Sequence, residues 1–278
     1  MNKRWFPFLF FIAFILISFL YLFYRTNSQL IFWQIRIPRY LLTFLTGFIL
    51  AGVGSIFQIM LNNSLAEPYI LGISSGAALG STIAIVSGLV IFIPIFGFFG
   101  AFSTMILVWK LSFLGGYFNT TKLLLSGIIV GMFFSAMISL LMYLFQQDIG
   151  NIIQILMGNL GHIFSEKEWY VFLFVFSISM FLMIYLYFLS TKINILASGE
   201  LSAISLGVDV KKLRKQIFFI SSILTGVTVA YAGIIGFVGL VIPHILRMIL
   251  GVNLKKNFWY ICFAGVFLLL ICDFIAVH

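Results

Sequence analysis

The segment GFVGLVIPHILRMILG, residues 236–251, is almost wholly apolar but is interrupted in ways that apolar membrane helices rarely are. It contains Pro243 and Arg247, and it has glycines near both ends. About fifteen helical residues extend only about 22 Å, less than the ~30 Å apolar core of a bilayer. Such a short element is tolerated at membrane depth only where protein or a water-filled path surrounds it. The segment therefore predicts a short, re-entrant helix inside a helical membrane protein.

The composition of the whole chain agrees with this prediction. The 278 residues are 63% hydrophobic and only 8% charged, and the mean hydropathy is +1.19. Long, continuous apolar runs recur from end to end, whereas a β-barrel would need alternating segments of about ten residues. The fold class is therefore predicted to be an all-α, polytopic transmembrane bundle. The net charge of +9 lies in short loops between spans, so it indicates orientation rather than a nucleic-acid partner.

At about 20 residues per span, the sequence predicts nine transmembrane helices. They lie near residues 5–24, 40–61, 69–90, 94–113, 122–145, 168–190, 215–234, 236–250 and 258–277. The first apolar run is long and has no small-residue cleavage site, so it is predicted to be an uncleaved span rather than a signal peptide. Residues 149–165 are too polar and too few to span and are predicted to form a helix at the surface.

The lysines and arginines predict a cytoplasmic N-terminus. With that orientation 12 of the 16 basic residues lie inside, as the positive-inside rule requires. The four on the outer side are Arg25, Arg36, Arg39 and Lys167. The longest hydrophilic stretch, 191–214, is then a cytoplasmic loop within a single transmembrane domain, 1–278. No Walker A loop occurs in the sequence, so any ATPase must be a separate chain.

Small and polar residues mark two further places. Gly72, Gly76 and Gly80 recur every four residues, which predicts one helix face for close packing. Arg36 and Arg39 lie at the outer edge of the second span, where they either snorkel or form a basic docking point for an acidic partner. Cys262 and Cys272 lack metal-ligand spacing and are predicted to be packing residues.

Four motifs together carry a family resemblance. They are RIPR (36–39), QIMLNNSLAEPYILGISSGAALG (58–80), GELSAISLGV (199–208) and GFVGLVIPHILRMILG (236–251). Over roughly residues 30–275 the chain resembles the FecCD/BtuC-type permeases of ATP-binding-cassette importers for iron–siderophore complexes, haem and vitamin B12. Because the four motifs occur in the family's order and spacing, the resemblance is specific.

The resemblance implies a type II importer permease with ten spans that pairs with a second copy or a paralogue. It implies two cytoplasmic ATP-binding subunits and an extracytoplasmic substrate-binding protein that delivers the metal chelate. The permease itself would be no enzyme and would hold no cofactor or metal. It would lie in the cytoplasmic (inner) membrane of a bacterium or archaeon. An iron–siderophore complex or haem is the expected cargo, with cobalamin as the alternative.

By position, the resemblance also assigns roles to residues. Arg36 and Arg39 match arginines that dock the binding protein. ATPase coupling is assigned to Glu200, Ser205, Leu206 and Gly207. The translocation path and gate are assigned to Gln58, Asn62, Leu65, Thr120 and Thr121. The short re-entrant helix contributes Gly236, Gly239, Pro243, His244 and Arg247.

Within that short helix the residue types lead to specific expectations. Gly236 and Gly239 are expected to permit a tight re-entry and close packing. Pro243 removes a backbone donor, so a neighbouring residue or water must satisfy the carbonyl left without a partner. His244 is expected to be packed and hydrogen-bonded rather than a metal ligand. Arg247 is expected either to snorkel to the basic inner edge or to contact the ATPase side.

The chain departs from the family pattern in three places. It ends at His278, where the family continues through an outer loop and a tenth span. Val277 stands where many members have a third docking arginine. Asn62–Asn63–Ser64 replaces a common R/E-N-P. A truncated, non-functional permease copy is therefore one alternative expectation.

Two other classes of protein are weighed against the importer permease. An ion-coupled secondary transporter or channel needs ionisable residues within its spans. Here Glu67, Arg247 and Asp273 all lie near predicted span ends. An intramembrane enzyme needs a metal or nucleophile constellation, but the three histidines are scattered and form no H-E-x-x-H motif.

Overall fold

The computed structural model describes residues 6–24, 28–113 and 118–277, and this part of the chain is helical with no β-strand. Lys3, Arg4, Arg25 and His278, on which the orientation and chain-end expectations partly depend, lie outside these ranges. The longer helices are α1 (Phe6–Phe23), α3 (Ile37–Met60), α4 (Ile73–Val86), α5 (Ile93–Ser112), α6 (Thr120–Leu144), α8 (Glu166–Ala197), α10 (Val210–Ala232), α11 (Val238–Leu250) and α12 (Leu254–Val277). The shorter elements are α2 (Gln29–Ile31), a π-helical turn (Phe32–Arg36), η2 (Pro68–Leu71), η3 (Val90–Phe92), η4 (Gln146–Asp148), α7 (Ile149–Met157) and α9 (Glu200–Ser205).

Within the described residues, each of the nine predicted spans corresponds to one of the longer helices named above, so the predicted fold class is confirmed. Among the described residues, six segments are long and apolar enough to cross a membrane: Gln29–Met60, Val90–Ser112, Thr120–Leu144, Glu166–Ala197, Val210–Ala232 and Leu254–Val277. Three shorter apolar helices, Phe10–Phe23, Ile73–Val86 and Val238–Leu250, account for the others. The region 149–165 contains the short helix α7, followed by a non-helical connection to α8.

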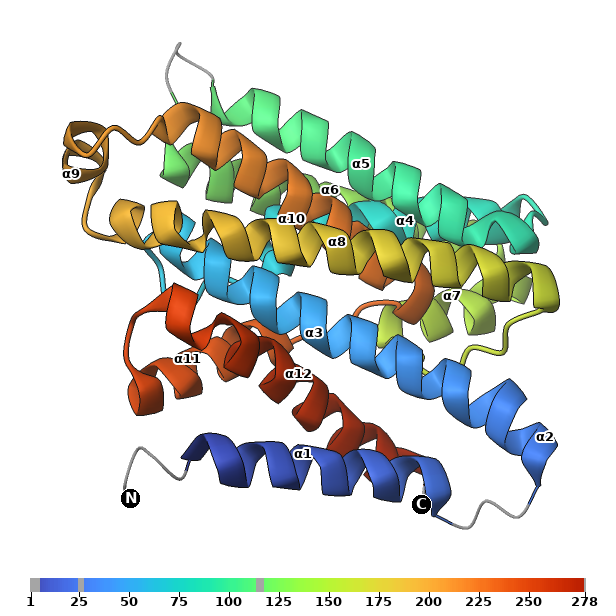
Figure 1. The fold of residues 1–278 in the computed structure, drawn as a ribbon. Helices are drawn as coiled ribbons and strands as arrows, with labels where there is room; N and C mark the ends of the chain where they lie inside the picture. The colour runs from blue at the N-terminus through green and yellow to red at the C-terminus, as the bar shows by residue number, and fades with distance from the viewer. Residues whose placement is uncertain (1–5, 25–27, 114–117, 278) are drawn as a thin grey trace.

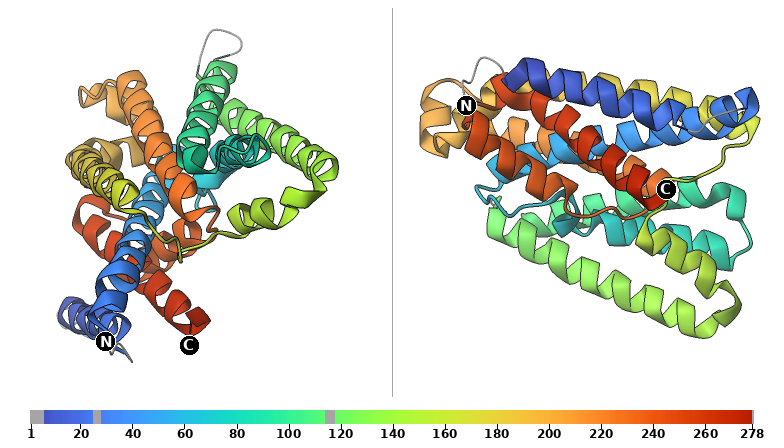
Figure 2. Two further views of the ribbon diagram at one scale, coloured as in Figure 1. Left: turned by 90° about the vertical axis from the view of Figure 1, so that its right-hand side faces the viewer. Right: turned by 90° about the horizontal axis from the view of Figure 1, so that it is seen from below.

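Helix α3 forms the centre of the bundle. In its most apolar window 83% of the residues are buried, against 22%, 28% and 22% in the corresponding windows of α5, α6 and α8. It packs against α8, α10, α11 and α12, and two views show α6 and α1 at opposite edges of the molecule (Figure 2). The peripheral helices therefore keep wide apolar faces that lipid or a partner subunit must cover.

Pairs of glycines allow the helices of the bundle to cross closely. A Cβ added to Gly47 of α3 would lie 2.7 Å from the carbonyl oxygen of Gly265 in α12. A Cβ on Gly76 of α4 would lie 2.8 Å from the carbonyl oxygen of Gly100 in α5. Without an aqueous hydrophobic effect between spans, such close backbone packing is a main source of helix association.

The predicted glycine face of α4 is correct in two of its three positions. Gly76 and Gly80 both face α5 at distances where a side chain would clash. Gly72 is an exception, because it precedes α4 and has a φ of +72°. Its αL conformation ends η2, and a Cβ there would lie 2.7 Å from the carbonyl oxygen of Gly127 in α6. It is therefore a turn residue that also contacts a different helix.

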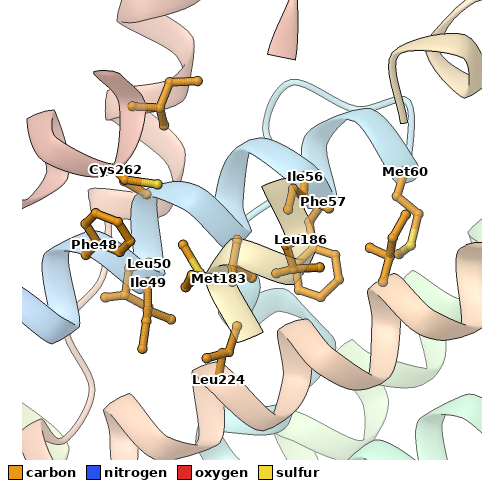
Figure 3. Close-up of a cluster of buried hydrophobic side chains, with 14 of the residues drawn as sticks. Phe48, Ile49, Leu50, Ile56, Phe57, Met60, Met183, Leu186, Leu224 and Cys262 are labelled. Atoms are coloured by element: carbon orange, nitrogen blue, oxygen red, sulfur yellow. The ribbon is translucent and has the colours of Figure 1, made fainter. Parts of the chain in front are cut away.

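The apolar core surrounds α3. Side chains of α3 such as Phe48 and Phe57 meet Met183 of α8, Leu224 of α10 and Cys262 of α12 (Figure 3). Cys262 is fully buried, as predicted for a packing residue. Cys272, in contrast, is exposed, because it lies on the outer face of α12. The prediction that both cysteines pack was therefore wrong for Cys272.

Different helix ends gather at the two ends of the bundle. One end holds α9, the C-termini of α5 and α8, and the N-termini of α6, α10 and α12 (left in Figure 1). The opposite end holds α2, the N-terminus of α8 and the C-terminus of α12. The two groups of residues expected to meet protein partners, Arg36 with Arg39 and the loop 191–214, therefore lie at opposite ends.

Candidate functional site

Arg39 joins three helices at the end of the bundle that contains α2. Its Nε donates to Oδ2 of Asp273 at 2.8 Å, and its Nη2 donates to Oδ1 at 2.6 Å. The Tyr21 hydroxyl of α1 donates to the same carboxylate. Such a bidentate pair fixes the planes of both groups. The arginine side chain remains 25% exposed while that of Asp273 is 5% exposed, so only the arginine can be reached from outside.

Arg36 has a different role in the same corner. It ends the π-helical turn that leads into α3, and its two Nη atoms each lie 3.2 Å from a backbone carbonyl oxygen, those of Tyr21 and Tyr24. These carbonyls lie at the C-terminus of α1, where a cation is favoured. Both arginines that sequence analysis predicted for docking therefore also hold α1 against α3.

A cavity of about 180 Å³ adjoins the two arginines. Its lining consists of Tyr21, Ile31, Ile35, Arg36, Arg39, Phe274 and Val277. Apart from the arginines and the tyrosine the walls are apolar, so an entering carboxylate would meet two guanidinium groups in a site of low polarity. Val277, the position at which many family members have arginine, lies in this same wall.

At the opposite end, α9 presents an apolar surface. Leu201, Ile204 and Leu206 are all exposed, and Leu201 is the most exposed of them at 85%. Ser205 donates to the Ser202 carbonyl at 2.9 Å and so closes the last turn of the helix. Gly207 follows with a φ of +77°, a conformation that glycine adopts without strain. The predicted coupling residues Ser205, Leu206 and Gly207 thus form the end of one short exposed helix.

Arg214, which sequence analysis missed, connects this helix to the rest of the bundle. Its Nη2 lies 2.8 Å from Oε2 of Glu200 at the start of α9. Its guanidinium carbon also lies 5.0 Å from the centroid of the Phe118 ring, a cation–π distance. Phe118 directly precedes the N-terminus of α6, where Thr120 and Thr121 lie. The only sequence signal was a basic residue fourteen positions after Glu200.

Thr120 and Thr121 begin α6, and the preceding Asn119 caps the helix. The Asn119 Oδ1 accepts from the Thr121 N–H at 2.8 Å and from the Lys122 N–H at 3.1 Å. This is the usual way in which asparagine satisfies the first free donors of a helix. Helix α6 packs on α4, α5 and η2, so the two threonines belong to a different part of the bundle from Gln58.

Gln58 lies at the contact between α3 and α11. It is buried, and its Nε2 lies 3.3 Å from the Gly239 carbonyl oxygen and 3.2 Å from that of Leu240. Pro243 cannot donate to the Gly239 carbonyl four residues before it. Gln58 therefore supplies the missing donor, as the sequence predicted that some neighbouring group must.

Arg247 also turns toward this contact, because its Nη2 donates to Oε1 of Gln58. The expectation that Arg247 snorkels was therefore wrong. Gln58 is buried, so its amide oxygen needs a donor from within the protein, and Arg247 supplies that donor. Asn62 and Leu65, the other two residues assigned to this part of the gate, are exposed in the connection after α3. Asn62 has a φ of +49°, which asparagine tolerates better than most residues.

The connection into α11 depends on Glu67, which sequence analysis noted without assigning it a role. Its Oε1 accepts from the Phe237 N–H at 2.7 Å, and Phe237 has a φ of +68°. Burial raises the pKa of the Glu67 carboxyl above its ordinary value, while the Phe237 N–H opposes that shift. Glu67 therefore holds a strained turn at the start of the short helix.

Two residues in and just before α11 do not pack as the sequence predicted. A Cβ on Gly239 would lie 2.8 Å from both the Leu50 carbonyl oxygen and Cδ of Pro68, so this glycine does permit close packing. Gly236 does not, because the nearest atom to its Cβ position, Oε1 of Glu67, is 3.9 Å away. His244 is exposed rather than packed, because α11 turns Pro243 and Leu246 toward the bundle.

Comparison with known proteins agrees with this architecture. A model of the FecCD transport family matches residues 4–278. The molybdate import system permease protein MolB of Haemophilus influenzae is 35% identical over 233 residues, 81% of this chain and 67% of the relative. The vitamin B12 import system permease protein BtuC of Klebsiella pneumoniae is 36% identical over 227 residues, 80% of this chain and 66% of the relative. The matches thus span about two thirds of the length of these relatives.

A solved structure described as a metal-chelate type ABC transporter in an inward-facing conformation has the same fold. It superposes with a TM-score of 0.85 at 31% sequence identity, covering 96% of this chain and 88% of the other.

Proposed function

Because this chain belongs to the FecCD transport family, we propose that it is the membrane-spanning permease subunit of an ATP-binding-cassette importer. The family match over residues 4–278 carries the proposal. The fold supports it, because six long apolar helices form a multi-pass bundle with wide peripheral faces. The permease would move its cargo by alternating between two packings of these helices, driven by ATP at another chain.

The proposed cargo is a metal chelate, with an iron–siderophore complex as the first candidate and haem or cobalamin as alternatives. BtuC, named for vitamin B12, and the structural neighbour, named for metal chelates, support this class, whereas MolB is named for molybdate, a metal oxyanion rather than a chelate. In each case the metal arrives already bonded to other atoms. The permease would therefore recognise the shape of the complex and would need no metal ligands of its own.

The proposed partners occupy the two ends of the bundle. Two ATP-binding subunits would bind at the end that contains α9, whose exposed leucines and isoleucine offer an apolar contact. An extracytoplasmic binding protein would dock at the Arg36 and Arg39 end, and a second permease copy or a paralogue would complete the path. The basic helix ends beside α9 support a cytoplasmic position for that end, and hence for the N-terminus, in the inner membrane.

The test of the function is purification of the chain from its native membrane in mild detergent. An ATP-binding-cassette ATPase should copurify. Uptake is then measured with labelled iron–siderophore, haem, cobalamin and molybdate. Uptake of the compound that the complex transports should stop when the ATPase is inactivated. Uptake that survives loss of the ATPase and stops when the proton gradient is collapsed would instead establish the ion-coupled alternative.

Docking at the two arginines leads to a prediction for a double charge reversal. We expect Arg36→Glu with Arg39→Glu to weaken binding-protein affinity at least about tenfold at low salt, because like charges would then oppose acidic side chains of the partner. The loss should shrink as the salt concentration rises. Binding of the purified extracytoplasmic protein to the permease in nanodiscs measures the effect.

The Arg39–Asp273 ion pair requires a control, because reversing Arg39 also places two carboxylates together. Asp273→Asn breaks the same ion pair but leaves both arginines positive. We expect this variant to keep full docking affinity or to exceed it, since Arg39 is released toward the partner. An equal loss of docking in Asp273→Asn would mean that the arginines act only within the bundle.

A further inference from the structure

Helices α5 and α8 begin, and α10 ends, at the same end of the bundle (Figure 1). Two adjoining cavities are lined by residues of these helix ends. The inner one, of about 340 Å³, lies among α4, α5, α7, α8 and α10. The outer one, of about 220 Å³, lies between the first turns of α5 and α8. Both are lined by Ile91, Pro94, His162, Glu168 and Tyr231, so they share a wall.

The shared wall carries a carboxylate with one oxygen unused. Oε2 of Glu168 accepts from the N–H and the hydroxyl of Ser165, at 2.8 and 2.9 Å, in a capping box at the start of α8. Within the described residues Oε1 has no hydrogen-bond partner. Burial lowers the pKa of the neighbouring His162, while the Glu168 carboxylate opposes that shift. A cationic group could therefore bind at Oε1.

A positive charge lies one residue away. Lys167 lines the outer cavity and is exposed, so its ammonium is available to an anion. A ligand that carries a negative group and a positive group a few atoms apart could bind Lys167 and Glu168 at the same time. Trp169 and Tyr170 follow directly, and these residue types are enriched at the headgroup level of a bilayer.

Below the outer cavity both helices expose apolar side chains along one face. On α5 and the turn before it, Ile91 is 76% exposed, and Ile95 and Phe99 continue at four-residue spacing. On α8, Val171 and Phe174 are exposed three residues apart. Ile91, Ile95 and Val171 themselves line the cavity, so its walls run directly into these two apolar faces. Acyl chains of lipid match such surfaces.

The inner cavity offers polar groups deeper in the bundle. Ser81 of α4 lines it, is 1% exposed and has no hydrogen-bond partner for its hydroxyl within the described residues. Asn151 and Gln154 of α7 also line it. A buried hydroxyl without a partner is unfavourable, so a ligand that hydrogen-bonds it is favoured.

We propose that these cavities bind one phospholipid whose headgroup carries a primary ammonium. The ammonium would bind Oε1 of Glu168, the phosphate would bind Lys167, and the acyl chains would lie along the exposed faces of α5 and α8. This site needs only a membrane, so it holds whether or not the transport function does.

The test uses the full chain in nanodiscs that contain equal mole fractions of phosphatidylethanolamine, phosphatidylcholine and phosphatidylglycerol. After extraction, native mass spectrometry counts the retained lipids. We expect phosphatidylethanolamine to be retained about tenfold over phosphatidylcholine, whose quaternary ammonium cannot donate a hydrogen bond, in line with the strength of hydrogen bonds to charged groups. Equal retention of the three lipids, as for an annular shell, would overturn the proposal.

Three variants locate the site. Glu168→Gln should reduce the retention of phosphatidylethanolamine relative to phosphatidylcholine to about onefold. The variant keeps the capping box, because glutamine can accept the same hydrogen bond at this position. Lys167→Gln should lower retention of phosphatidylethanolamine and phosphatidylglycerol alike. Glu166→Gln, one residue before Lys167 and in neither cavity lining, should change nothing. An unchanged preference in Glu168→Gln, or soluble phosphoethanolamine that displaces the lipid at equal concentration, would refute a lipid site at Glu168.

Discussion

Replacement of Gly239 by valine is expected to reduce the amount of folded protein recovered from membranes by at least about tenfold. The added Cβ alone would lie 2.8 Å from the Leu50 carbonyl oxygen and from Cδ of Pro68. Neither neighbour is a flexible side-chain end, so α3 and α11 would have to separate. Overpacking of this kind typically costs about 1–3 kcal/mol, and more when the neighbours cannot yield. Separation would also remove Gln58 from the carbonyl that Pro243 leaves without a donor.

The chain offers a control three residues away. Gly236→Ala places a methyl group in ordinary van der Waals contact with Oε1 of Glu67, at 3.9 Å, and Gly236 has no positive φ. Its yield and elution profile on size-exclusion chromatography in detergent should equal those of the unmodified chain. If Gly239→Val folded as well as Gly236→Ala, then the close crossing of α3 and α11 would be unnecessary for the fold.

Glu200→Arg is expected to uncouple ATP hydrolysis from uptake, on the proposed assignment of α9 to ATPase contact. Uptake should fall at least about tenfold while the assembled complex still hydrolyses ATP. The reversed charge would face Arg214, which now lies 2.8 Å from the carboxylate. Because exposed ion pairs contribute only about 0–1 kcal/mol, the fold should survive. The damage would instead be the wrong charge that α9 presents to the ATPase. Paired uptake and ATPase assays in proteoliposomes measure it.

Two further variants separate an internal role of Glu200 from a partner contact. Glu200→Gln removes the charge without reversing it and should lower uptake less than about twofold, since the exposed pair is weak. The exchange Glu200→Arg with Arg214→Glu restores an ion pair with opposite polarity. We expect it to remain uncoupled, because the partner would still meet the wrong charge. Recovered coupling in the exchange would show that Glu200 acts through Arg214 alone.

The sequence was sufficient to predict the helices, because each apolar run is recognised from its own composition and length. A run of about 20 apolar residues must be helical in lipid, since no water is present to satisfy its backbone. Each of the nine predicted spans therefore contains a helix in the described part of the chain, and the helix predicted at 236–250 is short, as expected. Four ordered motifs were likewise sufficient to identify the family, because their residues and spacing can be read directly from the sequence.

The contacts between helices could not be predicted in this way. Arg39 and Asp273 are 234 positions apart, and nothing in either neighbourhood marks them as partners. The same holds for Gln58, which sequence analysis placed in a gate and which the structure joins to Arg247 and the Gly239 carbonyl. A buried polar group must find a partner, but the sequence does not say which one.

By itself, then, the sequence determined that this is a helical membrane protein of nine apolar helices with the motifs of an importer permease. Only the tertiary structure decided that Gly239 but not Gly236 lies at a helix crossing, that His244 faces outward, and that Glu168 lies in the wall of a cavity. The physical reason is that apolarity and backbone satisfaction are local to each segment. Burial, pairing and close approach depend on which segments pack together, and that depends on the whole chain.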